Sequence, residues 1–280
     1  MTIVQTRSAP AAPADTTAPV RSGAFRDAVA AEFRKVRTLR STWAFLGGGV
    51  AASLLGALIL FMLVGAYDAA TPADKLKYET ADPTVVTMPF VMFFVGAIGA
   101  MLITSEFGTR SLGPSLLAVP QRRTLIGAKA TVAGLIGLTS GAVFVLFAFV
   151  DARLLLGDRP APINPWPQWT DAIPTVLCST LVVMATTLVA MGLGALLRST
   201  AGTLTTLGSL VLVAPIFAHF LPTAWQLRLA SILLPNLTPQ LAGSNHPYLL
   251  SQGGALAVVA GYVLLALGAG AIAFHRRDTA

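Results

Sequence analysis

The segment 104–129, which reads TSEFGTRSLGPSLLAVPQRRTLIGAK, combines residue types suited to binding another protein. Glu106 and Arg110 have the i, i+4 spacing of an ion pair along one helix face. Gly108 and Thr109 supply a bend and a hydroxyl that can cap a short helix that follows. This chemistry is recognition by charge and shape, since the segment holds no pair of groups arranged for acid–base catalysis.

The second half of this segment has the features of a short surface helix. Leu112, Leu116 and Leu117 give the helix an apolar side, and Pro120 ends it. Arg122 and Arg123 hold the chain at a membrane surface, and Lys129 is expected to snorkel to that surface from the start of a span. A short helix with exposed leucines fits a groove in a partner protein. A structured loop without a partner is the alternative.

The segment Arg21–Ser41 is predicted to form an amphipathic helix. Apolar residues recur at three- and four-residue spacing on one face, at Phe25, Val29, Phe33, Val36, Leu39 and Trp43, and Arg26, Arg34 and Arg37 lie opposite. Such a helix rests at the membrane interface with its basic face toward anionic headgroups. Glu32 falls near the apolar stripe, so it must snorkel, pair with a neighbour such as Lys35, or face another protein. A simple membrane anchor and a docking surface both remain open.

Several classes of function lack their residues. No G-x-x-x-x-G-K-[ST] motif occurs, so the chain has no usual cradle for a nucleotide phosphate. The three histidines and Cys178 are too isolated to form a metal site, and we expect none. The net charge of +7 comes without a nucleic-acid recognition motif, so no nucleic-acid partner is expected. A membrane-embedded hydrolase is disfavoured because the apolar runs hold no acids or His–acid pairs.

The elements that position these segments are apolar runs. Hydrophobic residues make up 55% of the 280 residues and charged residues 11%, about half the charged share of a soluble domain. A spanning helix needs about 20 mostly apolar residues. Six runs meet this requirement, the fifth being richer in Thr and Gly: Trp43–Tyr67, Thr84–Ser105, Ala130–Val150, Ala172–Leu197, Ser199–Phe220 and Gly253–Phe274. Arg198, between the fourth and fifth runs, predicts a tight hairpin.

The basic residues predict the orientation. With the N-terminus inside, 14 of the 19 Lys and Arg and five of the 12 acidic residues are cytoplasmic, a net charge of +9. The outer loops then carry five basic and seven acidic residues, a net charge of −2. Both ends of the chain are therefore expected in the cytoplasm, which places segment 104–129 there too.

The segment Leu221–Gln252 is predicted to lie outside, yet it is largely apolar. Prolines at positions 222, 235, 239 and 247 forbid one continuous helix. Two short helices that dip into the outer leaflet explain both features, and an ordinary cap that lies on the membrane is the alternative. Residues 1–22 are rich in Ala, Pro and Thr and are expected to form a disordered tail.

Three stretches together resemble a known family, the ABC type-2 transporter permeases, and its actinobacterial branch in particular. The pattern of EFGTR at 106–110, LAVPQRR at 117–123 and Ala128-Lys129 is similar to the coupling loop of that family. EFRKVR at 32–37, followed by Leu39-Arg40-Ser41 and Trp43, resembles its N-terminal connecting helix. The apolar stretch between the fifth and sixth spans resembles its external re-entrant hairpin.

The resemblance implies an all-α membrane protein with six transmembrane helices. It has a connecting helix at 23–42, a transmembrane domain at 43–280, a cytoplasmic coupling helix and an external re-entrant segment. It implies a non-enzymatic permease subunit, in a bacterial plasma membrane, that exports a lipophilic or amphipathic compound. A non-transporting immunity or sensor partner on the same scaffold is the alternative.

The partners implied are an ABC ATPase subunit, a second permease copy and membrane lipids. No cofactor is expected in this chain, because ATP and magnesium belong to the ATPase. The residues implied to couple to the ATPase are Glu106, Gly108, Thr109, Arg110, Leu112, Leu116, Pro120, Arg122 and Arg123, with Glu32, Phe33, Arg34, Lys35 and Arg37 on the connecting helix.

Overall fold

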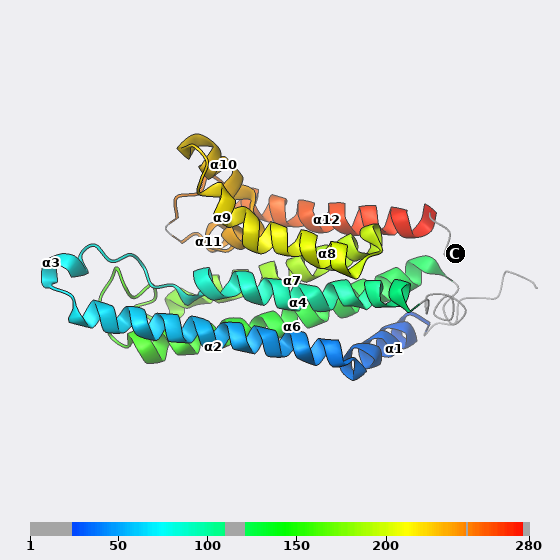
Figure 1. The fold of residues 1–280 in the computed structure, drawn as a ribbon, viewed down its shortest axis with the longest axis horizontal. Helices are drawn as coiled ribbons and strands as arrows, with labels where there is room; N and C mark the ends of the chain where they lie inside the picture. Colours follow the sequence, from blue (N-terminus) through cyan, green and yellow to red (C-terminus); the bar gives the residue numbers. More distant parts are fainter. Residues whose placement is uncertain (1–23, 110–120, 245, 277–280) are drawn as a thin grey trace, which may run out of the picture.

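The computed structural model describes residues 24–109, 121–244 and 246–276, and in these ranges the protein is all-helical (Figure 1). Six helical segments are long and apolar enough to cross a membrane. They are α2 (Arg40–Ala69), α4 (Pro83–Gly108), α6 (Arg122–Leu156), η1 (Trp169–Ala172) with α7 (Ile173–Leu197), α8 (Thr200–Gly208) continued through η2 (Ser209–Val213) to α9 (Ala214–Ala218), and α12 (Gln252–Arg276). The six predicted spans are thus confirmed. The chain is a multi-pass membrane protein.

The helices extend beyond the charge-free runs that predicted them. α6 begins at Arg122, well before the predicted start at Ala130, and it continues to Leu156. α4 likewise passes the predicted end at Ser105 and includes Glu106. Backbone hydrogen bonding continues through charged residues as long as their side chains find water or a partner, so a helix need not end where its apolar run does.

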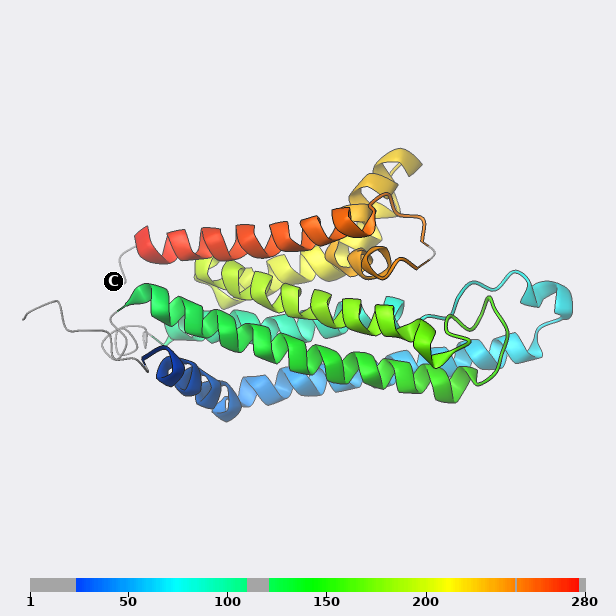
Figure 2. The ribbon, with the colours of Figure 1, turned by 180° about the vertical axis from the view of Figure 1, so that it is seen from behind.

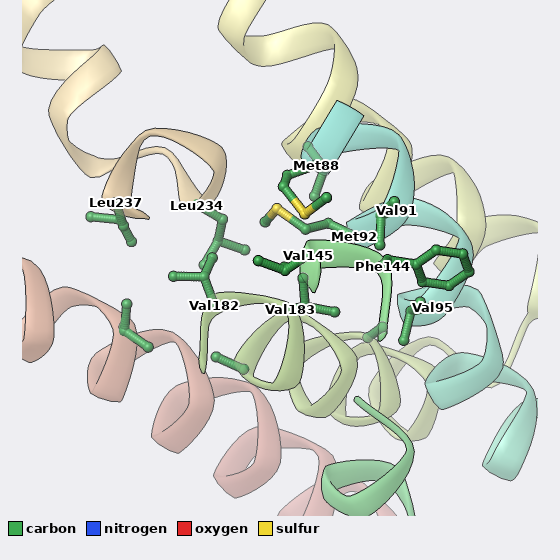
Figure 3. Packing of buried hydrophobic residues seen from close by; sticks show 14 of the residues in the cluster. Met88, Val91, Met92, Val95, Phe144, Val145, Val182, Val183, Leu234 and Leu237 are labelled. Atoms are coloured by element: carbon green, nitrogen blue, oxygen red, sulfur yellow. The ribbon is translucent and has the colours of Figure 1, made fainter. Parts of the chain in front are cut away.

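Helix α7 lies at the centre of the bundle and packs against α4, α6 and α12 (Figures 1 and 2). The main apolar core forms where Met88, Val91, Met92 and Val95 of α4 meet Val182 and Val183 of α7 (Figure 3). Outward surfaces are apolar as well, since Leu54 and Leu58 on α2 and Leu264 and Leu265 on α12 are more than half exposed. Leucines exposed on this scale suit contact with lipid tails rather than water.

Glycines let α7 approach its neighbours closely. A Cβ on Gly99 of α4 would strike the backbone of Thr187, and one on Gly137 of α6 would lie 2.8 Å from the Cα of Met184. Such close approach through small residues is typical of membrane helices. Gly261 and Gly268 on α12 differ, since nothing lies within 4 Å of an added Cβ.

The bundle has two unlike ends (Figures 1 and 2). The first, called here the α1 end, holds α1 (Ala24–Thr38), the start of α6 and the C-terminal end of α12. The second, the α3 end, holds α3 (Pro72–Lys75) and the loops around it. The chain turns sharply between α7 and α8, with Arg198 in the left-handed region (φ 52°), so the predicted hairpin is present.

The segment after α9 contains the two short helices that were predicted. They are α10 (Thr223–Ile232) and α11 (Leu237–Ala242), joined by the turn η3 (Leu234–Asn236). α11 packs against α7 and α12, and Leu234 and Leu237 are fully buried in the main core (Figure 3). Gln240 secures the turn, because its Nε2 donates to the carbonyls of Ser231 (2.9 Å) and Asn236 (2.8 Å).

Candidate functional site

Helix α1 lies against α6 at the α1 end of the bundle. It stops at Thr38 because Leu39 is extended (φ −76°, ψ 125°), and α2 starts again at Arg40. Trp43 bridges this break, since its indole Nε1 donates to the carbonyl of Arg37 at 3.1 Å. The amphipathic segment is therefore a separate short helix set at an angle to the first span.

The face that α1 turns to the bundle differs from the predicted apolar stripe. Ala28, Glu32 and Val36 are buried, whereas Phe25 and Phe33 are 49% and 42% exposed. The aromatic residues thus occupy the flank of the helix, and the supposed misfit Glu32 lies at the centre of the buried face. The side chains that Glu32 contacts on the bundle explain why α1 is rotated in this way.

Four residues from three helices form a buried ionic cluster: Glu32 and Lys35 of α1, Glu106 of α4 and Lys129 of α6. The Nζ of Lys129 lies 2.8 Å from Oε2 of Glu32 and 2.9 Å from Oε1 of Glu106. It also donates to the carbonyl of Leu102 at 2.9 Å. The Nζ of Lys35 bonds Oε1 of Glu106 and lies 3.1 Å from Oε1 of Glu32.

The ionic cluster pairs equal numbers of opposite charges, and three of its four members are closed to solvent. Two carboxylates face two ammonium groups, and Glu32, Glu106 and Lys129 are 3%, 2% and 0% exposed. The prediction that Lys129 reaches the membrane surface is wrong, because its three donors are used inside the protein. Charges buried in this way are tolerated only when paired, and loss of one partner leaves an uncompensated charge.

Lys35 is the member at the rim, with its side chain 45% exposed. Partial burial acts to lower its pKa, but the hydrogen bond and the charge of Glu106, together with Glu32, outweigh it and raise the pKa above 10.5. The ammonium of Lys35 is therefore retained at neutral pH.

A second contact joins the other helices at the same end. Arg122 at the start of α6 donates to the carbonyl of Phe274 on α12 at 3.2 Å. The guanidinium of Arg198 lies over the ring of Phe107, 5.1 Å from its centroid, and Phe107 meets Phe274 edge to face. A cation at the C-terminal end of α12 is favoured by the helix dipole. Together with the ionic cluster, this contact ties α4, α6, α7 and α12 at one end.

The remaining predicted residues divide into three groups. Gly108 and Thr109 end α4 and are exposed, with the Thr109 hydroxyl donating to the carbonyl of Ser105 at 2.8 Å. Phe33, Arg34, Arg37 and Arg123 are exposed on the surface of the α1 end. Arg110, Leu112, Leu116 and Pro120 lie outside the described residues, as does the predicted pairing of Glu106 with Arg110.

Sequence reasoning anticipated the contact of Glu32 with Lys35 as one option, but not the contact with Lys129, 97 residues away. Two signals pointed to it. Glu32 was out of place on an apolar face, and Lys129 followed an apolar turn at the start of a span. A buried partner of the opposite charge satisfies both residues at once, whereas the sequence left snorkelling open for each of them.

Comparison with known proteins places this region in a family. The family described as ABC-2 family transporter protein matches residues 28–199, more than half of the chain. The chain belongs to the ABC-2 transporter family. No curated protein matches the chain. Members of the ABC-2 family are the membrane-embedded permease components of ABC transporters, generally non-catalytic, and they associate with an ABC ATPase subunit.

The matched range contains the whole ionic cluster. It begins at Ala28 on the buried face of α1, includes Glu106 and Lys129, and ends at Ser199 just after α7. The central packing of α4, α6 and α7, together with the helix α1 that the cluster holds in place, is thus the part of this ABC-2 protein that the family shares.

Proposed function

We propose that this chain is the permease subunit of an ABC exporter for a lipophilic or amphipathic compound. Its α1 end faces the cytoplasm, and a separate ATPase subunit binds there to α1 and to the segment 104–129. Two permease chains, identical or related, assemble with two ATPases. ATP and magnesium act on the ATPase, so the permease contributes contact and movement rather than catalysis.

The observation that carries the proposal is the position of the ionic cluster. α4 ends at Gly108 and α6 begins at Arg122, so the two ends of the predicted coupling segment 104–129 belong to these two helices. The cluster bonds the end of α4 and the start of α6 to each other and to α1. A displacement of either α1 or the coupling segment would therefore move α4 and α6 together as one rigid unit.

Movement can then spread through the bundle. α4 and α6 both pack along α7, with backbone contacts too close for a side chain at Gly99 and Gly137. Tightly packed helices move as bodies rather than deform. Closure of the ATPases on nucleotide would rock the α4–α6–α7 core, and the path for the compound would open toward the α3 end.

Two further assignments belong to this proposal. α1 lies in the membrane interface, with exposed Arg34 and Arg37 toward lipid headgroups or the ATPase. The α10–α11 segment is a re-entrant element in the outer leaflet, since its turn is held by Gln240 and its leucines are buried against α7.

The test is reconstitution of the full chain with its ATPase in proteoliposomes. Arg123→Glu reverses an exposed charge beside the coupling segment, and Leu112→Asp with Leu116→Asp removes its predicted apolar side. Both variants should lose co-purification of the ATPase and ATP-dependent transport. Lys77→Glu, at an equally exposed site beyond α3, is the matched control and should retain both.

Two results would overturn the proposal. A stable complex with full transport in both variants would remove the ATPase from this surface. Binding of the ATPase without any movement of lipophilic compounds by the unaltered protein would indicate a non-transporting sensor or immunity subunit instead.

A further inference from the structure

A cavity of about 880 Å³ lies toward the α3 end of the bundle. Its walls come from α2, residues 79–86 around the start of α4, the loop 161–167, Thr175 of α7, and residues 239–244 and 246–248, so distant parts of the chain line it. A volume of this size is in the range of sites that bind drug-sized molecules. No part of the ionic cluster reaches the cavity.

Most of the wall is apolar, and this favours a ligand whose larger part is apolar. Leu60 and Leu63 of α2 form one side, Val85 and Val86 of α4 another, and Trp166 contributes an indole that is 4% exposed. Such a surface gains free energy by covering an apolar or aromatic molecule.

The charged groups on the wall determine which sign of charge the ligand should carry. Glu79 and Asp82 line the cavity, and among the described residues that line it there is no Lys or Arg. His246 and Tyr248 are the remaining titratable side chains, and they stack on each other with centroids 5.8 Å apart. Two carboxylates beside an apolar wall favour a cation over an anion or a neutral molecule.

A small recess of about 30 Å³ adjoins this cavity and shares Asp82, Val85 and Thr175 with its wall. The recess has room for a group the size of one water molecule. Ser179 of α7 lines it, and its hydroxyl is buried, with the residue 1% exposed and no hydrogen-bond partner in the described part of the chain. An orphaned hydroxyl in a polar recess indicates a site for a hydrogen-bonding guest.

Asp82 offers that guest a carboxylate oxygen. Oδ1 caps α4, accepting the backbone N–H of Thr84 at 2.8 Å and its hydroxyl at 2.6 Å. Within the residues that the structure describes, Oδ2 has no partner. Because Oδ1 already occupies the N-terminus of α4, that helix end is not open to an external anion. Burial raises the pKa of the Asp82 carboxyl, which a bound cation would offset.

We propose that this cavity binds a lipophilic amine, with its ammonium group in the recess between Asp82 and Ser179 and its apolar body against the exposed side chains of Val85 and Val86. As a statement of the transported substrate class, this rests on the proposed export function. As a binding site, it needs only this chain.

The test is equilibrium dialysis of naphthylethylamine against the purified full chain in lipid nanodiscs, with empty nanodiscs subtracted. Naphthylethanol and naphthylacetate carry the same ring with a neutral and an anionic head. The amine should bind saturably and the other two should not. Asp82→Asn keeps a good cap for α4 and should weaken amine binding about 10- to 100-fold, the range of a lost charge-assisted hydrogen bond. Ser179→Ala should weaken it about 2- to 10-fold.

Asp74→Asn is the matched control, because Asp74 is an exposed acid on α3 outside the cavity, and amine binding should not change. Equal affinity of Asp82→Asn and the unaltered chain would overturn the site, as would equal binding of the three naphthyl compounds. The ATPase is absent from this assay, so failure here leaves the proposed coupling intact, and failure of ATPase binding leaves this site intact.

Discussion

Lys129 of α6 and Glu32 of α1 face each other at 2.8 Å inside the protein, with the lysine wholly shielded from solvent. This pair fixes the rotation of α1, because only one face of that helix presents a carboxylate to the lysine. Glu106 completes the arrangement from α4. Helix α1 is thus held at the bundle end by the ionic cluster together with Val29 and Val36, which pack in an apolar cluster with residues of α4 and α6.

Lys129→Met should destabilise the protein severely. The change leaves two buried carboxylates with one ammonium at the rim, and breaking a buried pair costs about 3–5 kcal/mol. The thermal midpoint of the purified protein in detergent should fall, and protease cleavage within α1 should increase.

Glu32→Gln added to Lys129→Met restores the charge balance and should recover part of that loss. Lys77→Met, which removes an exposed ion pair with Asp74, is the control and should change stability by no more than about 0.5 kcal/mol. If the double variant is less stable than Lys129→Met alone, charge balance is not what holds the cluster.

Lys35 should make the stability of the protein depend on pH in the alkaline range. Its pKa is raised above 10.5, so the stability it contributes is fully present below pH 10.5 and is lost as pH rises through the higher pKa of the folded state. Lys35→Arg keeps its charge in that range. The unaltered protein should therefore lose more thermal stability than Lys35→Arg in the alkaline limb, whereas the two should run parallel around pH 7. Parallel curves throughout would show that Lys35 adds nothing to the cluster.

Much of the fold follows from the sequence alone because lipid imposes one strong requirement. Each span needs a long apolar run, and the six runs and the turn at Arg198 could therefore be identified in the sequence. Pro222 precedes α10 and Pro235 lies in the turn between α10 and α11, so these two prolines separate the short helices after α9 as predicted, whereas Pro239 lies within α11. These are local constraints, which a single stretch of sequence carries by itself.

The ionic cluster could not be predicted from single stretches of sequence. Whether Glu32 meets Lys35, lipid headgroups or Lys129 depends on how α1 is rotated and how far α6 extends, and both are set by tertiary packing. The third span was predicted only over residues without charge, so it began at Ala130 and did not include Lys129, which lies within α6. The cavity toward the α3 end is formed where segments that are distant in the sequence meet, which no local sequence pattern indicates.

Two glycines on neighbouring helices should respond oppositely to alanine. A Cβ on Gly192 of α7 would strike the backbone of Ala266 on α12, so Gly192→Ala must push the helices apart and should cost about 1–3 kcal/mol. Gly261 on α12 has open space around it, so Gly261→Ala should be neutral or stabilise by up to about 1 kcal/mol. Thermal midpoints in detergent give both values, and a loss at both positions would contradict the close contact of α7 with α12.

The orientation of the bundle gives the last prediction. The basic residues predict that the α1 end lies in the cytoplasm, and each end of the bundle offers a position for labelling: the exposed Arg123 at the start of α6, and Asp74 on α3, whose side chain is 50% exposed. Cys178, the one native thiol, is first replaced by alanine. A membrane-impermeant maleimide added to intact cells should then label Asp74→Cys and spare Arg123→Cys, because only the α3 end is outside. Permeabilised cells should show labelling of both, which serves as the control for access. Labelling of Arg123→Cys in intact cells would invert the bundle and move the ionic cluster and the coupling segment away from any cytoplasmic ATPase.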